Sequence, residues 1–116
     1  MGNPVVHFEV VGNNAEALQS FYKEAFDWQM QPAVPNYAMA LPGDAHGING
    51  GIGAAMDGGA GHVTFYVAVP DLEATLSKIE SLGGSRVMEP VDVPEGPSIA
   101  MFADPEGHLV GLIKGP

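Results

Sequence analysis

GHVTFYVAVPDLEATLSKIESLGG, residues 61–84, is the stretch that decides the fold of this chain. Residues 62–69 are rich in β-branched and aromatic side chains, which is typical of a strand. Pro70 and Asp71 then open a helix, because proline is tolerated at a helix N-terminus, where its missing N–H would be unpaired anyway. Leucine and isoleucine recur at helical spacing as far as a pair of glycines, which are suited to end a helix. The stretch therefore predicts a strand followed directly by a helix.

Three further strands are predicted downstream of this helix. A proline-rich loop and a tight DPEG turn separate them, because proline, glycine and aspartate favour turns. The expected strands cover residues 85–89, 98–103 and 108–113. The second half of the chain therefore has the order β-α-β-β-β.

The first half has the same predicted order. Asn13 and Asn14 are good N-caps for a helix whose apolar positions form one stripe. We expect a short strand at 28–31 to be ended by Pro32 and Pro35, and the glycine-rich strand at 50–55 is weak. The expected elements are a strand at 4–11, a helix at 15–27, and strands at 28–31, 37–41 and 50–55.

Aligning the two halves supports an internal repeat. His7 falls on His62, and similar residues in the helices and later strands match at comparable offsets. Residues 57–61 (DGGAG) are the best linker but are too short to separate independent domains. We therefore predict one α+β domain, residues 1–116, with tandem βαβββ modules at about 1–57 and 58–116. Because neither half can hide both faces of its sheet, the modules are expected to form a curved mixed sheet around a ligand cleft.

Composition excludes several functions. The 116 residues carry a net charge of −10, which disfavours nucleic acids and anionic membranes. No cysteine is present, so disulfides and thiolate metal sites are excluded, and a reducing cytoplasm is the expected location. No apolar run is long enough to span a membrane, and we expect no signal peptide. GINGGIG (47–53) does not match GxGxxG, and no nucleotide cofactor is expected.

Three motifs carry a resemblance to a known family. They are PVVHFEV with FYKEAFDW, the stretch at 61–84, and MFADPEGHLVGLI at 101–113. In order and spacing the chain resembles the vicinal oxygen chelate superfamily, which includes glyoxalase I, extradiol dioxygenases and bleomycin-resistance proteins. The likeness covers nearly the whole chain and is strongest to the uncharacterised glyoxalase-like group. It implies the two-module fold described above.

The resemblance implies four metal-ligand positions, on the first and fourth strand of each half. The first-strand positions are His7 and His62, which could bind a divalent metal such as Zn, Ni, Mn or Fe. The fourth-strand positions are Gly53 and Gly111, where glyoxalase I has carboxylates. Catalytic zinc usually has three protein ligands, so the expected metal site is incomplete. Strict glyoxalase I activity is not expected, because glycine cannot serve as the base.

Neighbouring side chains could complete a site. Glu9 shares a strand face with His7 and could act as a ligand or a base, although it could also simply line a polar pocket or form an ion pair. Tyr66 shares a face with His62 and could donate a hydrogen bond. Glu9 and Tyr66 are thus the catalytic candidates. The predicted ligand-pocket residues are Gly53, Gly111, Thr64, Tyr37 and Met101. We interpret His46 as a solvated loop residue and His108 as a turn residue.

Two functional hypotheses remain open. The first is a glyoxalase-like protein that acts on or binds a small oxygenated molecule through a non-standard or metal-free site. The second is a small-molecule binding protein of the bleomycin-resistance type, which sequesters its ligand without metal or catalysis. Whether the chain is an enzyme is left open by the residues. The resemblance also implies a homodimer.

Overall fold

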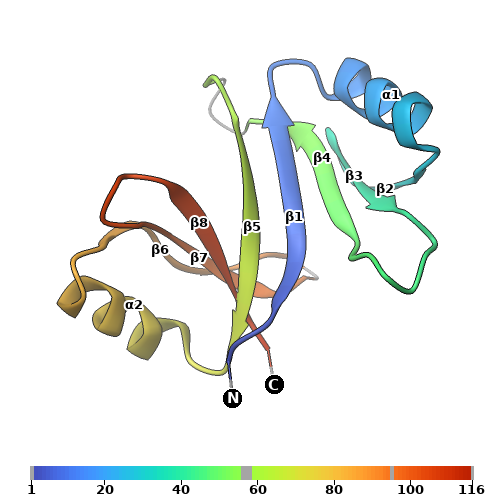
Figure 1. The fold of residues 1–116 in the computed structure, drawn as a ribbon. Coiled ribbons are helices and arrows are strands. Elements are labelled where there is room, and N and C mark those ends of the chain that lie inside the picture. The colour runs from blue at the N-terminus through green and yellow to red at the C-terminus, as the bar shows by residue number, and fades with distance from the viewer. Residues whose placement is uncertain (1, 56–58, 95, 116) are drawn as a thin grey trace. The chain divides into compact units, whose positions relative to one another are not determined.

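The computed structural model describes residues 2–55, 59–94 and 96–115. These residues form eight strands and two helices in the order βαβββ-βαβββ, which confirms the predicted α+β fold (Figure 1). By their contacts they divide into two compact units, one of residues 7–63 and one of residues 2–6 with 64–115. Residues 57 and 58 of the predicted linker are not among them, so the boundary expected at 57/58 lies outside the described residues. The single-domain organisation with its cleft stays a prediction.

The 7–63 unit contains a four-stranded mixed sheet and one helix. Its strand order is β2-β3-β4-β1. The central pair β1 and β4 is parallel, and the pairs β3–β4 and β2–β3 are antiparallel. The elements are β1 (Val5–Gly12, which starts in the other unit), α1 (Ala15–Phe26), β2 (Gln29–Val34), β3 (Tyr37–Leu41) and β4 (Gly50–Ala54).

Helix α1 covers one face of this sheet. The Oδ1 atom of Asn14 accepts a hydrogen bond from the backbone N–H of Ala17 at 3.0 Å, which confirms the predicted N-cap. The helix ends where Asp27 adopts a left-handed conformation with φ of 60°. The core beneath it contains Val10, Ala40 and Ile52, against which Phe8, Leu18, Tyr22, Trp28 and Met30 pack.

The other unit repeats this architecture with the strand order β5-β8-β7-β6. Strands β5 and β8 are parallel, and the remaining pairs are antiparallel. Asp71 caps the helix through Oδ1, which accepts from the N–H of Ala74 at 3.0 Å. The core consists of Val69, Leu72, Leu76, Ala100 and Leu112. The elements are β5 (His62–Val69, which starts in the 7–63 unit), α2 (Leu72–Ser81), β6 (Ser85–Asp92), β7 (Ser98–Ala103) and β8 (Leu109–Lys114).

Two strand ends differ from the sequence prediction, for one physical reason. Strand β2 continues through Pro32 to Val34, and β6 continues through Pro90 to Asp92, whereas we expected proline to end both strands. Each strand stands last in the order of its unit, and the register of each shifts near the proline. An edge strand tolerates proline because the missing N–H can face away from the ladder. Among the described residues no helix is long and apolar enough to cross a membrane.

Candidate functional site

The predicted site residues of the first module lie on the sheet face opposite α1. His7 and Glu9 alternate with the core residue Val10 along β1, so they point away from the core. In the register of β1 and β4, Glu9 lies opposite Gly51. Tyr37 of β3 lies opposite Gly53 on the same face. The sheet thus carries a histidine, a carboxylate and a tyrosine above two glycines.

A continuous chain of hydrogen bonds joins these side chains to His62. The hydroxyl of Tyr37 donates to Oε1 of Glu9 at 3.0 Å, and Nε2 of His7 lies 3.1 Å from the same hydroxyl. The other carboxylate oxygen, Oε2 of Glu9, lies 2.8 Å from Nε2 of His62. All four residues belong to the 7–63 unit. The structure therefore brings both predicted metal ligands, one predicted catalytic residue and one predicted pocket residue together.

The positions of the protons in this chain follow from donor and acceptor capacity. A tyrosine hydroxyl has one proton, and Tyr37 donates it to Glu9. The tautomer of His7 that satisfies this arrangement is the one in which Nε2–H donates to the hydroxyl oxygen. An ionised carboxylate only accepts, so Nε2 of His62 must donate to Glu9. Both imidazoles are thus assigned the Nε2–H form by the hydrogen-bond network.

Burial favours the neutral form of His7. Desolvation lowers its pKa below the ordinary value of 6.5, and the nearby Glu9 carboxylate opposes this by favouring the charged form. The carboxylate side chain itself is only 13% exposed, and the His62 side chain is 26% exposed. The site is therefore sheltered, yet its carboxylate and His62 retain contact with solvent.

The lowered pKa of His7 predicts a pH dependence of stability. Above about pH 6.5 the imidazole is neutral in both the folded and the unfolded chain. It therefore does not make the free energy of unfolding depend on pH in that range. Below that, the unfolded chain binds the proton first, and the free energy of unfolding falls as pH decreases toward the lowered pKa. We expect His7→Gln to make the free energy of unfolding depend less on pH in this acidic range. Urea unfolding at a series of pH values between about 5 and 8 measures that dependence. His46→Gln, on an exposed loop, is the control and should keep the wild-type slope.

The side chain of Tyr37 packs over Gly51 and Gly53 of β4, where any larger residue would collide with its surroundings. A Cβ added at Gly51 would lie 1.7 Å from the tyrosine oxygen. One added at Gly53 would lie 2.3 Å from the carbonyl oxygen of Asn36 and 2.7 Å from Cδ1 of the tyrosine ring. Asn36 precedes the tyrosine with φ of 65°, a conformation that asparagine tolerates in turns, and its carbonyl accepts from the N–H of Ala54 at 2.9 Å. Our sequence reasoning missed Gly51, although its spacing of two from Gly53 places both on one face.

The predicted site residues of the second module form a separate group. Tyr66, Gly111 and Met101 lie opposite one another in the register of β5, β8 and β7. A Cβ at Gly111 would lie 2.4 Å from the Tyr66 ring, so a tyrosine covers this glycine too. The hydroxyl of Thr64 donates to the carbonyl of Leu109 at 2.6 Å, which is a structural hydrogen bond. The ligand-pocket role of Gly53 and Gly111 stays a prediction.

The metal that the family resemblance implies does not fit these side chains as they are arranged. Among residues 2–55, 59–94 and 96–115, no three histidine, aspartate or glutamate side chains are positioned to hold an ion. Neither fourth-strand glycine supplies an oxygen. We therefore derive no chemical step through a metal.

The other two histidines are local turn residues. Nδ1 of His46 lies 2.9 Å from Asp44, in a loop where the histidine side chain is 97% exposed. Nδ1 of His108 lies 3.0 Å from Asp104, and its backbone N–H also binds that carboxylate within the DPEG turn. These contacts agree with our interpretation of His46 as a loop residue and His108 as a turn residue.

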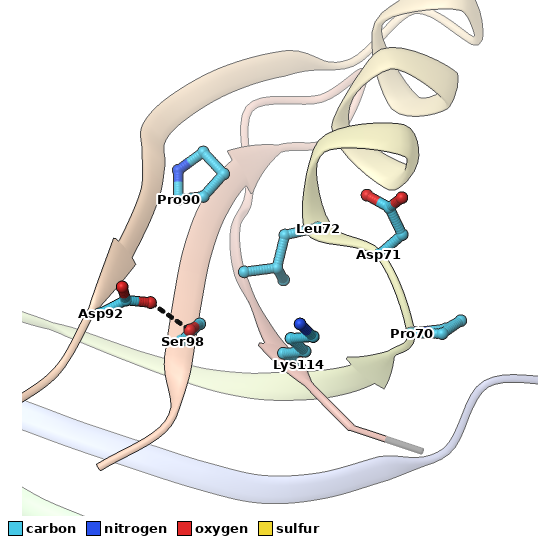
Figure 2. Close-up of a pocket in the computed structure, with 7 residues that line it drawn as sticks. All are labelled: Pro70, Asp71, Leu72, Pro90, Asp92, Ser98 and Lys114. Atoms are coloured by element: carbon cyan, nitrogen blue, oxygen red, sulfur yellow. Dashed lines mark hydrogen bonds between the residues drawn. The ribbon is translucent and has the colours of Figure 1, made fainter. Parts of the chain in front are cut away.

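A hollow of about 440 Å³ lies in the other unit and contains none of the predicted site residues. Figure 2 shows the Lys114 side chain between Ser98 and Pro70 in this view. Ser98 donates a hydrogen bond to the carboxylate of Asp92. The hollow thus offers charges of both signs and is a competing place for a ligand. Its lining residues are Pro70, Asp71, Leu72, Pro90, Asp92, Ser98 and Lys114.

Comparison with known proteins gives one consistent result. Residues 5–112 match the sequence model of the Glyoxalase/Bleomycin resistance protein/Dioxygenase superfamily. CFP32 of Mycobacterium bovis, named as a candidate glyoxylase, is 34% identical over 79 residues, which are 68% of this chain. The match covers only 30% of the length of CFP32, so this chain corresponds to a part of that relative.

Two further proteins match over most of their length. A protein of Didymella fabae, described as containing a glyoxylase-like domain, is 25% identical over 116 residues, covering 93% of this chain and 91% of its own length. The crystal structure of methylmalonyl-CoA epimerase from Mycobacterium tuberculosis is similar in fold, with a TM-score of 0.69. Its sequence identity is 16%, over 97% of this chain and 87% of the epimerase.

Proposed function

Because this chain belongs to the Glyoxalase/Bleomycin resistance protein/Dioxygenase superfamily, we propose that it binds a small oxygenated molecule and moves a proton on it. The proposed place is the polar sheet face of the 7–63 unit. The observation that carries the proposal is the Glu9 carboxylate, held between the Tyr37 hydroxyl at 3.0 Å and His62 at 2.8 Å. The substrate class is a molecule with an acidic C–H next to a carbonyl group.

Glu9 is the proposed base. The carboxylate would take the proton from the carbon next to the carbonyl, and the C–H electron pair would move into the carbonyl to give an enolate. Returning the proton to carbon completes an isomerisation or an epimerisation, so the atoms and electrons balance without another reactant. An ionised carboxylate can accept about four hydrogen bonds, so it can contact its protein partners and a substrate together. A positioned base of this kind typically contributes about 10²–10⁴ in rate.

Tyr37 and His62 are the proposed positioning residues for this base. Each donates to a different oxygen of Glu9, so together they fix the plane of the carboxylate. His7 in turn donates to the Tyr37 hydroxyl and fixes its direction. Side chains locked by such hydrogen bonds need little reorganisation during a reaction. The hydrogen-bond donor role of Tyr66 stays a prediction.

Sequestration without reaction is the second candidate, as in bleomycin-resistance proteins. The glycines at 53 and 111 favour it, because tyrosine rings lie beside the two positions where the resemblance implies carboxylates. Aromatic faces and an acidic chain with a net charge of −10 would suit a cationic, partly aromatic ligand. In this case the Glu9 carboxylate would bind the ligand and move no proton.

Proton exchange in deuterated water separates the two candidates. The probes are small 2-oxo aldehydes, their thiol adducts and acyl-CoA thioesters, each followed by loss of the α-proton signal in NMR. We expect at least one probe to exchange faster with the protein present. Binding of these or of cationic aromatic compounds without exchange would support sequestration and contradict the proton-transfer proposal.

The location of binding is tested in the same samples. The backbone amide NMR signals of His7, Tyr37 and His62 and the imidazole signals of the two histidines should shift on binding. The backbone amide signals of Ser98 and Lys114 should not. Lys114→Met is the matched variant in the competing hollow and should bind the probe like the wild type. Loss of binding in Lys114→Met alone would move the site to the other unit and contradict the proposal. The homodimer and the location in the cell stay predictions.

A further inference from the structure

We propose that the hollow at the start of α2 binds a small zwitterion, namely an α-amino acid with a short apolar side chain. In this complex Asp92 accepts hydrogen bonds from the ammonium group of the ligand, and Lys114 binds its carboxylate. All the residues that line the hollow belong to the unit that contains residues 64–115. The inference concerns a second site and does not depend on the proton-transfer proposal for the 7–63 unit.

The first argument is a row of polar side chains across three strands. Asp92 of β6 pairs with Ser98 of β7, and the pairing of Ile99 with Ile113 brings Ser98 beside Lys114 of β8. Figure 2 shows Asp92 and Lys114 on either side of Ser98. Residues opposite one another on neighbouring strands share a face of the sheet. Neighbouring strands lie about 4.8 Å apart, so the two charged side chains leave one face roughly 10 Å apart.

The second argument is that the two charges do not neutralise each other. Lys114 forms no ion pair with any carboxylate among residues 2–55, 59–94 and 96–115. The hydroxyl of Ser98 donates to Oδ1 of Asp92 and occupies one acceptor position of that carboxylate. A carboxylate accepts about four hydrogen bonds and a lysine ammonium donates three, so both groups can bind a ligand. A ligand with both charges satisfies the two side chains together.

The third argument is the size and lining of the hollow. Its volume of about 440 Å³ lies toward the small end of ligand pockets, which typically measure about 300–1,000 Å³. The buried side chain of Leu72 and the rings of Pro70 and Pro90 offer apolar contacts to a short aliphatic group. Asp71 also lines the hollow, so a phosphate or another multiply charged anion would be repelled by two carboxylates. An amino acid with a small apolar side chain fits both the charges and the apolar lining.

Titration with L-valine tests the site. The backbone amide NMR signals of Ser98 and Lys114 should shift on valine addition, while those of His7 and Tyr37 in the other unit should not. Lys114→Met keeps most of the aliphatic stem and removes the charge. It should weaken valine binding roughly 10-fold or more, because a hydrogen bond between charged groups is lost. Asp92→Asn should weaken binding to a similar extent, although its amide oxygen can still accept from Ser98.

The matched control is Lys78→Met. Lys78 is an exposed residue of α2 and does not line the hollow, so the variant makes the same change in charge away from the site. It should bind valine like the wild type. Equal weakening in Lys114→Met and Lys78→Met would overturn the inference, because only the overall charge would then matter. Absence of shifts at Ser98 and Lys114 at the highest soluble valine concentration would also overturn it.

Two valine derivatives test the two charges of the ligand separately. N-acetylvaline lacks the ammonium group and valinamide lacks the carboxylate, so each should bind at least about 10-fold more weakly than valine. Binding of N-acetylvaline as tight as that of valine would show a simple carboxylate site and would overturn the zwitterion assignment. Binding of valinamide as tight as that of valine would show a cation site and would overturn it equally.

Discussion

Replacing Glu9 with glutamine is expected to lower the rate of α-proton exchange in a bound substrate by roughly 10²–10⁴-fold. Glutamine has nearly the same shape, and its amide oxygen can still accept the hydrogen bond from Tyr37. Its NH2 group then faces Nε2 of His62, which accepts in the Nδ1–H tautomer. Glutamine cannot take up a proton at neutral pH, so only the base is removed. Deuterium exchange followed by NMR measures the rate, and KM should change little, because the substrate contacts are retained.

The control for this variant is Glu24→Gln. Glu24 is an exposed glutamate on α1 in the same unit, so the substitution makes the same change in charge away from the proposed site. Its exchange rate should equal that of the wild type. Full exchange activity in Glu9→Gln would exclude Glu9 as the base, and an equal loss in both variants would point to a general effect of charge.

Leu76→Ala should give the largest loss of stability. Leu76 lies on α2 with 0% of its surface exposed and packs in the core with Val69, Leu72, Ala100 and Leu112. Removing a buried leucine side chain loses its transfer free energy and leaves a cavity, which together cost about 2–5 kcal/mol. Urea unfolding measures the free energy of unfolding directly, and the dependence on urea concentration should remain unchanged.

Leu82→Ala is the matched control for this substitution. Leu82 is the C-cap residue of the same helix, and it is 69% exposed. An exposed leucine far from the core should change the free energy of unfolding by about 0.5 kcal/mol or less. A similar loss in both variants would mean that α2 does not pack through Leu76 as described.

The pattern of apolar residues by itself determined the order of the elements. Period-two strands and the helix stripes depend on neighbours close in the sequence, so both helices and most strand bounds could be predicted. The N-cap Asn14 followed from the same local logic, since a cap binds a backbone N–H only three residues away, and Asp71, which was predicted to open α2, makes the equivalent hydrogen bond. The placement of His7 and Glu9 on one face also followed, because side chains alternate along a strand.

Strand position within the sheet decided what proline could do. Pro32 and Pro90 were expected to end their strands, yet both lie inside edge strands. Whether a strand is at an edge depends on the order of all the strands, and no local pattern encodes that order. The rule that proline breaks a strand holds where both sides of the ladder must be paired.

The arrangement of the candidate site was decided by the tertiary structure. The sequence identified His7, Glu9, Tyr37 and His62 separately, but Tyr37 meets Glu9 only because β3, β4 and β1 pair with one particular offset, and His62 at the start of β5 must also reach Glu9. The same offset places Gly51 and Gly53 beneath Tyr37, so that Gly53, which was predicted to line a ligand pocket, lies against a tyrosine side chain. Residues 28 to 53 positions apart in the chain meet there. Such contacts are set by the packing and pairing of whole strands. The components of the site could therefore be predicted from local sequence patterns, whereas their connection was decided only by the tertiary structure.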